Sequence, residues 1–487
     1  MKKLRVSWMT GLGILWLALF PLFSDCSYAH ITHTKWVAMQ TSLLLSLPAL
    51  PLGLRRGRRL CWPALILALL LAAQLTASFL WGSHSRLPES LWGDRRYEGL
   101  LTQLGYILIF LCLAMGRGQD SRIRDAAAAA LLLDALLCAL QYTGVNPLGF
   151  YPKGFSIGQN YEFQGVIGNI DMGVGYLSLA VPLTLLPWVL RGGARRLPAA
   201  LGGFAGIALL LLTEVQCGYF ALGVLGLFLL GLALVRPETR CRTALTGMGF
   251  CLTLLGRLCL RLPWLDGSEA VTLAWGWSRG RIAALSLAAA CLAAALLLRR
   301  HPGRGWRLRE AIPFCLSLPV LTLALTAALP VPERMGGLWE LHETLLGRGR
   351  DAFGSERLGI WRAAAVLIRE HPLWGTGPDT FLQAAREIMP SRGIFLRQAF
   401  DTPHCLPLAL AAASGLPALG LFLALLAVCL RRCAKDGARG AVLAACILCW
   451  AAQSLFTFSV CLTSPMAWAV LGMAVAGNTI EEAKSYV

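Results

Sequence analysis

Long apolar runs separated by short polar gaps extend over nearly the whole chain. The pattern predicts about fourteen apolar spans, each bounded by a change to polar sequence. Repeated runs of roughly 20 apolar residues are typical of helices that cross a lipid bilayer. We therefore expect an all-α, polytopic integral membrane protein with about 12–14 transmembrane helices. The spans lie near residues 7–24, 37–54, 60–81, 99–116, 125–143, 172–190, 197–213, 219–235, 243–262, 276–298, 311–330, 404–430, 440–462 and 465–478.

The composition agrees with a membrane protein rather than a soluble one. The 487 residues are 56% hydrophobic and 14% charged, with a mean hydropathy of +0.62. Soluble domains usually contain about 25% charged residues. An ordinary soluble fold is therefore excluded.

The net charge of +18 is explained by where the arginines lie. A basic chain can indicate a nucleic-acid partner. Here the arginines gather in short gaps between apolar spans, as at 55–59, 191–196, 299–309 and 431–432. Arginine-rich loops remain on the cytoplasmic side of a membrane. Alternating the spans from an inner N-terminus puts these gaps and both termini inside, so we expect membrane lipids and no nucleic acid as partners.

Cysteine usage gives no sign of a metal site. Most of the sixteen cysteines lie inside apolar runs, where a thiol acts as a small hydrophobic group. Cys446 and Cys449 form a C-x-x-C pair within "AACILCWAA", but no second pair or nearby histidine accompanies them. We expect neither a metal nor another cofactor.

The longest outer gap, residues 331–403, differs from every inner loop. It contains nine arginines, nine acidic residues and no lysine, so its net charge is zero. The positive-inside rule does not explain such a loop. Arginine guanidinium groups can instead form two hydrogen bonds to one phosphate group. We expect three regions: a helix bundle over 1–330, a large extracytoplasmic loop over 331–403, and C-terminal membrane helices over 404–487.

Within this loop, residues 355–370 have helical periodicity. An apolar face of Leu358, Trp361, Ala365 and Ile368 is predicted, with Arg362 and Arg369 off that face. His371-Pro372 ends the helix, because proline disfavours helical backbone at the residue before it. Gly375 and Gly377 then permit a tight turn. We expect the helix to lie on the outer membrane surface with its apolar side toward the lipid.

The segment "RLGIWRAAAVLIREHPLWGTGPDTF" resembles a signature of the O-antigen ligase and polymerase superfamily. That family shows an arginine, a tryptophan four residues later, then Pro-x-x-Gly-x-Gly and an aromatic residue. The matching positions are Arg357, Trp361, Pro372, Gly375, Gly377 and Phe381.

Two further motifs extend the resemblance. The Asp-x-x-His-Asn motif reads "DTPHC", so Asp401 and His404 match while Cys405 replaces asparagine. "GNID" resembles Gly-Asn-x-Asn through Gly168 and Asn169, with Asp171 replacing the second asparagine. Many members also carry Ser-Arg-Gly at the position where this chain has 216–218, "QCG", so that arginine is missing here.

The resemblance implies an all-helical membrane glycosyltransferase fold of the C type. It implies transfer or polymerisation of a glycan from a polyprenyl diphosphate onto an acceptor hydroxyl, without a nucleotide sugar or metal. The acceptor would be a glycan, lipid or protein, and the active site would face outward from the bacterial cytoplasmic membrane. Ligase and polymerase are not separable at this point.

Physical chemistry suits such a reaction. Fixed arginines stabilise a leaving diphosphate, and histidine is the usual base near neutral pH. We therefore assign His404, Arg357 and Asp401 as catalytic. The predicted substrate-binding residues are Arg362, Arg397, Asn169, Asp171, Gly375 and Gly377, with Arg369 and Arg392 as weaker candidates.

Each assignment has a structural alternative. His404 could begin a helix, Asp401 could cap it or orient His404, and Arg357 could pair with an acid of the loop. Gly375 and Gly377 could simply shape a turn. Asp134 lies within a predicted span and is expected to make a helix contact, for example with Arg257. Glu214 and Asp171 are expected near the outer membrane edge, where either could line the acceptor cavity.

Two other functions remain as alternatives. A transporter or flippase of lipid-linked saccharides predicts charges spread along midplane helices and two related halves, and neither pattern is visible in the sequence. A structural scaffold predicts that Arg357 and His404 are replaceable without loss.

Overall fold

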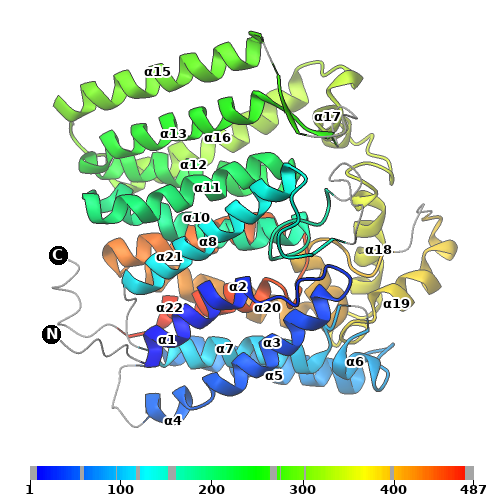
Figure 1. Ribbon diagram of the computed structural model, residues 1–487. Helices are drawn as coiled ribbons and strands as arrows, with labels where there is room; N and C mark the ends of the chain where they lie inside the picture. Colours follow the sequence, from blue (N-terminus) through cyan, green and yellow to red (C-terminus); the bar gives the residue numbers. More distant parts are fainter. Residues whose placement is uncertain are drawn as a thin grey trace.

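The computed structural model describes residues 8–54, 60–94, 96–116, 121–151, 161–263, 271–274, 276–300, 303–394 and 400–477. Most of its helices run roughly parallel in one layered bundle, with short helices across one end (Figure 1). The only sheet within these described ranges is a two-stranded antiparallel hairpin of β1 (Leu260–Arg261) and β2 (Thr272–Leu273). The all-α membrane fold predicted from the sequence is confirmed.

The N-terminal half supplies the lower and central helices of Figure 1. The first apolar span forms a helix interrupted by a π-helical turn, η1. The bounds are α1 (Trp8–Ile14), η1 (Leu15–Leu19), α2 (Phe20–Leu22), α3 (Ile31–Ser46), α4 (Ala49–Leu54), α5 (Trp62–Trp81), α6 (Glu89–Trp92), α7 (Leu100–Ala114), α8 (Ser121–Tyr142), α10 (Ile170–Arg191), η2 (Ala194–Arg196), α11 (Leu197–Thr213) and α12 (Gln216–Val235).

The C-terminal half adds the outer helices, the long polar segment and three buried or kinked helices. The bounds are η3 (Pro237–Thr239), α13 (Arg240–Leu258), α15 (Arg279–Arg300), α16 (Leu308–Ala328), η4 (Glu333–Met335), α17 (Gly337–Leu345), α18 (Arg357–Glu370), α19 (Phe381–Ile388), η5 (Pro390–Arg392), α20 (Leu406–Cys433), α21 (Gly437–Ser454) and α22 (Ser464–Val475).

Every predicted apolar span contains a helix, but not every helix is long and apolar enough to cross a membrane alone. Among the described residues, eight satisfy both conditions, and three shorter apolar helices accompany them. α10 and α22 are enclosed by other helices, whereas α15 and α16 expose most of their apolar side chains at the edge of the bundle. Such exposed apolar faces suit contact with lipid.

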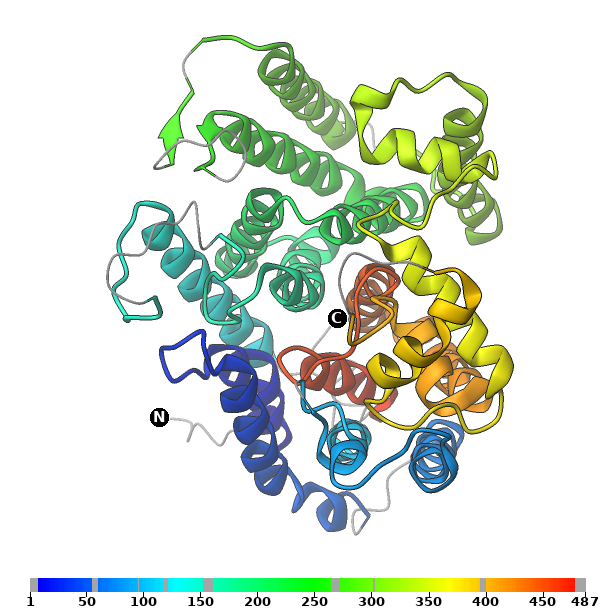
Figure 2. The same cartoon turned by 90° about the vertical axis from the view of Figure 1, so that its right-hand side faces the viewer.

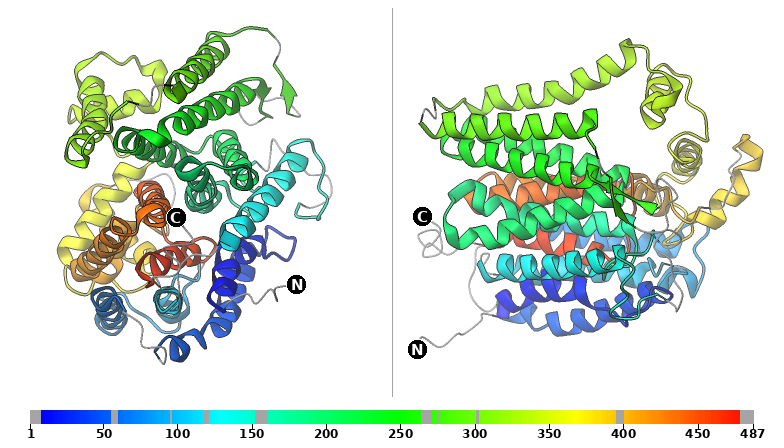
Figure 3. Two further views of the ribbon diagram at one scale, coloured as in Figure 1. Left: turned by 90° about the vertical axis from the view of Figure 1, so that its left-hand side faces the viewer. Right: turned by 45° about the horizontal axis from the view of Figure 1, so that its top comes forward.

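The polar segment between α16 and α20 lies at one end of the bundle. Figures 1 and 2 show α17, α18 and α19 crossing this end, together with α6. The start of α1 and the end of α22 lie at the opposite end, as the second view in Figure 3 also shows. This arrangement agrees with the prediction that both termini lie on the side opposite the long loop.

α18 departs from the predicted amphipathic helix in one respect. Its first helical residue is Arg357 and it ends at Glu370, as the His371-Pro372 stop predicts. Its buried stripe, however, consists of Ile360, Ala363, Ala364 and Leu367, while the predicted face is only half-buried. The stripe packs against α19 and α20, so protein packing buries a neighbouring stripe of α18, and contact of the predicted apolar face with lipid stays a prediction.

The Gly-x-Gly turn docks into a kink of α20. Gly415, with φ of 81°, interrupts that helix, and Pro417 has no amide hydrogen to continue it. The carbonyl groups of Ala412 and Ala413 instead accept hydrogen bonds from the amides of Thr376 and Gly377, each at 2.9 Å. The turn therefore satisfies backbone groups that the kink would leave unpaired inside the protein.

Arginines at the opposite end close several helices. Arg242 donates to the carbonyl oxygens of Val189 and Leu190 at the end of α10, at 2.7 and 3.1 Å. Arg439 donates to the carbonyl of Met473 near the end of α22 at 2.6 Å. These two arginines thus satisfy carbonyl groups that a helix end leaves free.

Candidate functional site

His404 lies just before α20 in a backbone conformation that is uncommon for a residue with a side chain, with φ of 49°. Its Nδ1 lies 3.0 Å from the carbonyl oxygen of Thr402. Because a carbonyl only accepts, Nδ1 must carry the proton, which leaves the Nε2 lone pair available. Burial lowers the pKa of His404 from its ordinary value of 6.5, and the positive charges of Arg96 and Arg357 act in the same direction. The imidazole is therefore suited to accept a proton.

The ring of His404 is held between two aromatic residues. Phe400 and Phe458 meet it edge to face, with ring centroids 5.5 and 4.9 Å away. Edge-to-face contacts of this kind fix ring orientation. The backbone carbonyl and the two rings together define where Nε2 points.

Trp361 connects α18, the helix that contains the first quoted motif, to the segment that carries His404. Its indole Nε1 donates to the carbonyl oxygen of Pro403 at 3.0 Å. This contact gives a physical reason for the tryptophan four residues after Arg357 in the quoted motif, since it fixes α18 against the residue preceding His404.

Arg357 begins α18 and has a free donor. Its Nη1 donates to the carbonyl of Gly354 at 3.2 Å, while its buried Nε has no hydrogen-bond partner among the described residues. No ion pair joins Arg357 to any acid in the described part of the chain, unlike Arg348 or Arg362 in the same loop. It acts electrostatically on Asp171, Cys217 and His404. An unpaired guanidinium with a spare donor suits an anionic ligand.

Cys217 stands where the sequence comparison found the family arginine to be missing. It lies at the start of α12, within electrostatic range of Arg357. Arg357 therefore supplies positive charge beside the position from which the second arginine is absent.

Asp401 pairs with a residue from the other half of the chain. Its Oδ2 accepts a hydrogen bond from Nε of Arg96 at 2.5 Å. The guanidinium of Arg96 also lies over the ring of Phe458, 4.2 Å from its centroid. Asp401 neither hydrogen-bonds to His404 nor caps α20, whose N-cap residue is Cys405. The sequence left open whether Asp401 orients His404 or caps the helix; in the structure the carbonyl of Thr402 contacts Nδ1 of His404 and Asp401 pairs with Arg96, and a catalytic role of Asp401 stays a prediction.

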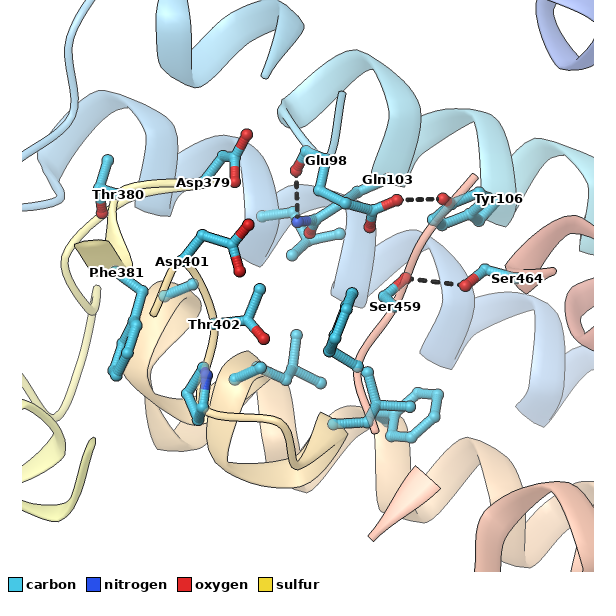
Figure 4. A pocket seen from close by; sticks show the side chains of 18 of the residues that line it. Glu98, Gln103, Tyr106, Asp379, Thr380, Phe381, Asp401, Thr402, Ser459 and Ser464 are labelled. Atoms are coloured by element: carbon cyan, nitrogen blue, oxygen red, sulfur yellow. Dashed lines mark hydrogen bonds between the residues drawn. The ribbon is translucent and has the colours of Figure 1, made fainter. Parts of the chain in front are cut away.

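A pocket of about 100 Å³ lies beside the segment 401–403. Figure 4 shows the side chains of Asp379 and Asp401 at one end, with the carboxyl group of Glu98 beside Tyr106 and with Ser459 nearby. Its remaining walls come mainly from α5, α20, α21 and α22 and include Phe458, Trp450 and Trp468. Asp379 and Asp401 also line a smaller adjoining pocket with Asp94, Arg96, Leu382 and Gln383.

Two acids of the larger pocket bind protons unusually well. Burial raises the pKa of Glu98 to about 8, and Tyr106 donates a hydrogen bond to its carboxyl group. Burial also raises the pKa of Asp379 to about 6, assisted by the nearby charge of Asp401 and opposed by the amide of Asp94, which donates to Oδ2 at 2.7 Å. Strongly shifted acids in a concave site are a common mark of functional residues.

The predicted Gly168-Asn169 motif begins α10. Oδ1 of Asn169 accepts hydrogen bonds from the amides of Asp171 and Met172 at 3.0 and 3.2 Å, a regular helix cap. Asp171 follows in the first turn, exposed, and both Arg357 and Arg96 act on it electrostatically. The structure thus brings Asp171 close to the Arg357 side, and binding by either residue stays a prediction.

Gly375 and Gly377 are explained by backbone packing. A Cβ on Gly375 would lie 2.3 Å from the carbonyl oxygen of Ala413, and one on Gly377 would lie 2.9 Å from Cβ of Ser85. The expected role in shaping the loop is confirmed, and direct substrate binding stays a prediction.

Among the other predicted arginines, two form ion pairs, one is exposed and one lies outside the described residues. Arg362 pairs with Asp351 at 2.5 Å, and Arg392 pairs with Glu370 at 2.6 Å. Both are surface ion pairs, as expected for most arginines of this loop, and Arg369 is exposed. Arg397 lies outside the described residues, so its substrate-binding role stays a prediction.

The contact between Asp134 and Arg257 that the sequence suggested does not occur. Its Oδ1 accepts the amide hydrogen of Val166 at 2.8 Å, and Arg257 instead pairs with Glu214, whose Oε1 lies 2.7 Å from Nε. Asp134 therefore fixes the backbone before α10, a structural role, because the chain folds a loop rather than another helix against it.

Sequence reasoning missed Arg96, Glu98 and Asp379. Asp379 stands inside the quoted "GTGPDTF", between motif positions that were singled out, and was passed over. Arg96 and Glu98 belong to "DRRYEG", in a short outer gap that contains no recognised motif. Only the folded chain brings them to Asp401, about 300 positions away.

Comparison with known proteins agrees with the motif resemblance. Residues 270–423 match the family model described as O-antigen ligase. Among curated proteins, no sequence matches the chain. The matched segment includes Arg357, Trp361, Asp401 and His404, and it supports, at a coarse level, a membrane glycan ligase or polymerase. The resemblance drawn from the motifs is thereby confirmed, and this polytopic membrane protein carries the O-antigen ligase family segment over residues 270–423.

Proposed function

We propose that the protein transfers or polymerises a glycan from a polyprenyl diphosphate carrier onto an acceptor hydroxyl. The single observation that carries this proposal is the pairing of a cation and a base at one end of the bundle. Arg357 lacks an acid partner among the described residues, and His404, on the segment that Trp361 fastens to the same helix, keeps a free Nε2.

His404 acts as the general base in this reaction. Nε2 takes the proton of the acceptor hydroxyl while the oxygen of that hydroxyl forms a bond to the anomeric carbon of the donor sugar. The bond from that carbon to the diphosphate oxygen breaks, and its electron pair leaves with the diphosphate. A positioned histidine contributes about 10²- to 10⁴-fold to such a step.

Arg357 stabilises the leaving group. Negative charge grows on the bridging oxygen as the bond breaks, and a fixed guanidinium that is not paired with an acid among the described residues can stabilise that charge. Arg357 supplies this charge from the protein itself, so we propose that no metal ion is required. A preorganised donor of this kind is worth roughly 3–4 kcal/mol of the barrier.

The site lies at the bundle end that carries α17–α19, opposite the arginine-closed helix ends. By the positive-inside rule the arginine-rich end faces the cytoplasm. We therefore place the reaction at the extracytoplasmic face of the bacterial cytoplasmic membrane. There a polyprenyl carrier can keep its chain in the bilayer while its diphosphate reaches Arg357.

The test uses the full chain in nanodiscs with a mixed pool of polyprenyl-diphosphate glycans. Release of free polyprenyl diphosphate is measured for the wild type, His404→Ala, Arg357→Ala and the control His84→Ala, whose ring pairs with Glu387 at the same end. We expect release by the wild type and the control, in EDTA, and losses of about 10²-fold or more in the two site variants. Product size then separates ligase from polymerase.

Equal release by His404→Ala and wild type would overturn the assigned base. Absence of release from every donor by folded wild-type protein would overturn the proposed reaction and favour a transporter of lipid-linked saccharides.

A further inference from the structure

We propose that the pocket beside residues 401–403 is an acceptor subsite, in which Glu98 binds the hydroxyl groups of a neutral sugar. This inference rests on the proposed glycan transfer. It adds which part of the site receives the acceptor and what chemical class of acceptor fits.

Glu98 lines this pocket and has a buried carboxyl oxygen without a regular hydrogen bond. The residue is 7% exposed and lines the cavity. Oε1 accepts a hydrogen bond from the hydroxyl of Tyr106, whereas Oε2 has no hydrogen-bond partner of regular geometry among the described residues, although the side chain of Ser459 also acts on the carboxyl group. A buried polar atom without a partner costs about 1–3 kcal/mol. The pocket therefore favours a ligand that supplies a hydroxyl group.

The protonation state of Glu98 fits a hydroxyl ligand. Because burial raises the pKa of Glu98 to about 8, the group holds a proton near neutral pH. A protonated carboxyl offers both a donor and an acceptor. A sugar hydroxyl also donates and accepts, so the two groups can satisfy each other.

The acidic lining of the pocket disfavours a diphosphate there. The charged or titrating acids in its lining are Glu98, Asp379 and Asp401, and no arginine, lysine or histidine lines it among the described residues. Like charges at close range are unfavourable in a poorly solvated site. Arg357 does not line the pocket. The donor diphosphate and the acceptor sugar therefore bind to different surfaces near the 401–404 segment.

The size and walls of the pocket suit one sugar ring. At about 10–15 Å³ for each water-sized group, a volume of about 100 Å³ holds roughly seven to ten such groups. Phe458, Trp450 and Trp468 provide apolar surface for the C–H faces of a ring. A hydrocarbon tail would fit those walls but would leave Oε2 of Glu98 without a partner, so a hydroxylated ligand is favoured over a lipid chain.

The test measures binding and transfer separately in the full chain. Saturation-transfer NMR in nanodiscs uses methyl glycosides of glucose, galactose and N-acetylglucosamine as probes, with the matching sugar phosphates for comparison. The variants are Glu98→Leu, Glu98→Gln and the control Glu89→Leu, an exposed acid on the same outer segment. Steady-state kinetics with varied acceptor, and donor hydrolysis without acceptor, are measured on the same preparations.

We expect the wild type to bind a neutral glycoside in preference to its phosphate. Glu98→Leu should weaken binding and raise the acceptor KM by about tenfold, which corresponds to the loss of one or two hydrogen bonds. Donor hydrolysis should stay unchanged. Glu98→Gln, which keeps a donor and an acceptor, and Glu89→Leu should stay within about threefold of the wild type.

Three outcomes would overturn the subsite. The first is an unchanged acceptor KM in Glu98→Leu. The second is binding of the sugar phosphates by the wild type as tight as, or tighter than, binding of the neutral glycosides. The third is displacement of the glycosides by a short alkyl chain, together with better binding of that chain by Glu98→Leu than by the wild type. Each of these leaves wild-type donor release intact. Loss of wild-type release would instead refute the proposed function, so the two failures are distinguishable.

Discussion

Arg96 and Asp401, which are 305 positions apart in the chain, form a hydrogen-bonded ion pair with Nε and Oδ2 2.5 Å apart. The pair joins the segment before α7 to the segment before α20. It holds Arg96 over Phe458, the same ring that meets His404 edge to face. The pair thus connects the acidic pocket to the ring contacts that position the proposed base.

Breaking this pair should reduce transfer without unfolding the protein. We expect Arg96→Gln and Asp401→Asn each to lower kcat by about tenfold or more, because a charge-assisted bond is lost and Phe458 is released. The double variant should resemble the singles, with a coupling of about 0.5–3 kcal/mol in a double-mutant cycle. Arg348→Gln, which breaks a surface pair with Glu343, serves as control. Fully additive losses would contradict the coupling.

The pH profile should have an acid limb set by His404. Protonation of Nε2 removes the base, so activity falls as pH decreases. Because burial lowers the pKa of His404, this limb should lie below the ordinary histidine value of 6.5. Single-turnover transfer measured across pH checks this. A limb above 6.5 would show that another group limits the rate.

An alkaline limb should arise from Glu98. Raising the pH through about 8 removes its proton and adds a negative charge beside Asp379 and Asp401, with Arg96 and Tyr106 also facing the group. Acceptor binding then weakens, so kcat/KM for the acceptor should fall above about pH 8 in the wild type. Glu98→Gln should show no such fall. An identical alkaline limb in that variant would assign the titration to a different residue.

Trp361→Phe should separate positioning from stability. The variant keeps a ring but loses the hydrogen bond to the carbonyl of Pro403. We expect stability to change by about 0.5–1.5 kcal/mol, while kcat falls by roughly tenfold because the segment before His404 is less fixed. Trp374→Phe, whose ring packs on Trp81, should keep normal kcat. A normal kcat in Trp361→Phe would show that other contacts suffice.

Gly375→Ala should destabilise the fold more than an equivalent change elsewhere. Gly375 has φ of 69° and its added Cβ would meet the carbonyl of Ala413 at 2.3 Å. Gly393 has φ of 64° with open space around it, so Gly393→Ala measures the backbone cost alone, about 1–2 kcal/mol. Thermal unfolding in detergent should show a distinctly larger loss for Gly375→Ala. Equal losses would mean that the loop shifts freely away from α20.

The sequence predicted the helical membrane fold well, because long apolar runs have few other stable arrangements. The stop of α18 at His371-Pro372 and the turn at Gly375 and Gly377 were also predicted, since proline and glycine act locally. The buried face of α18 was not predicted. Apolar residues surround much of that helix, and packing against α20 decided between neighbouring stripes.

The candidate site was only half predictable for a related reason. His404 and Arg357 stand in recognisable motifs within one stretch of chain. Arg96 and Glu98 stand in a short polar gap without a motif, and their importance depends on contacts with Asp401, Tyr106 and Phe458. Long-range partners of this kind leave no periodic pattern in a single sequence.

The docking of the 372–377 turn into the kink of α20 also determines when the site can exist during synthesis. Gln74 and Ser78 of α5 donate to carbonyl oxygens of Leu373, Ala413 and Ser414, which lie 299 to 340 positions later in the chain. These side chains of α5 therefore have no such partner until that later part of the chain has been synthesised. Until α20 is present, the turn lacks the carbonyl groups of Ala412 and Ala413 onto which it docks. A partly synthesised chain therefore lacks an assembled candidate site, and any truncation before α20 should show no glycan transfer however well its earlier helices insert.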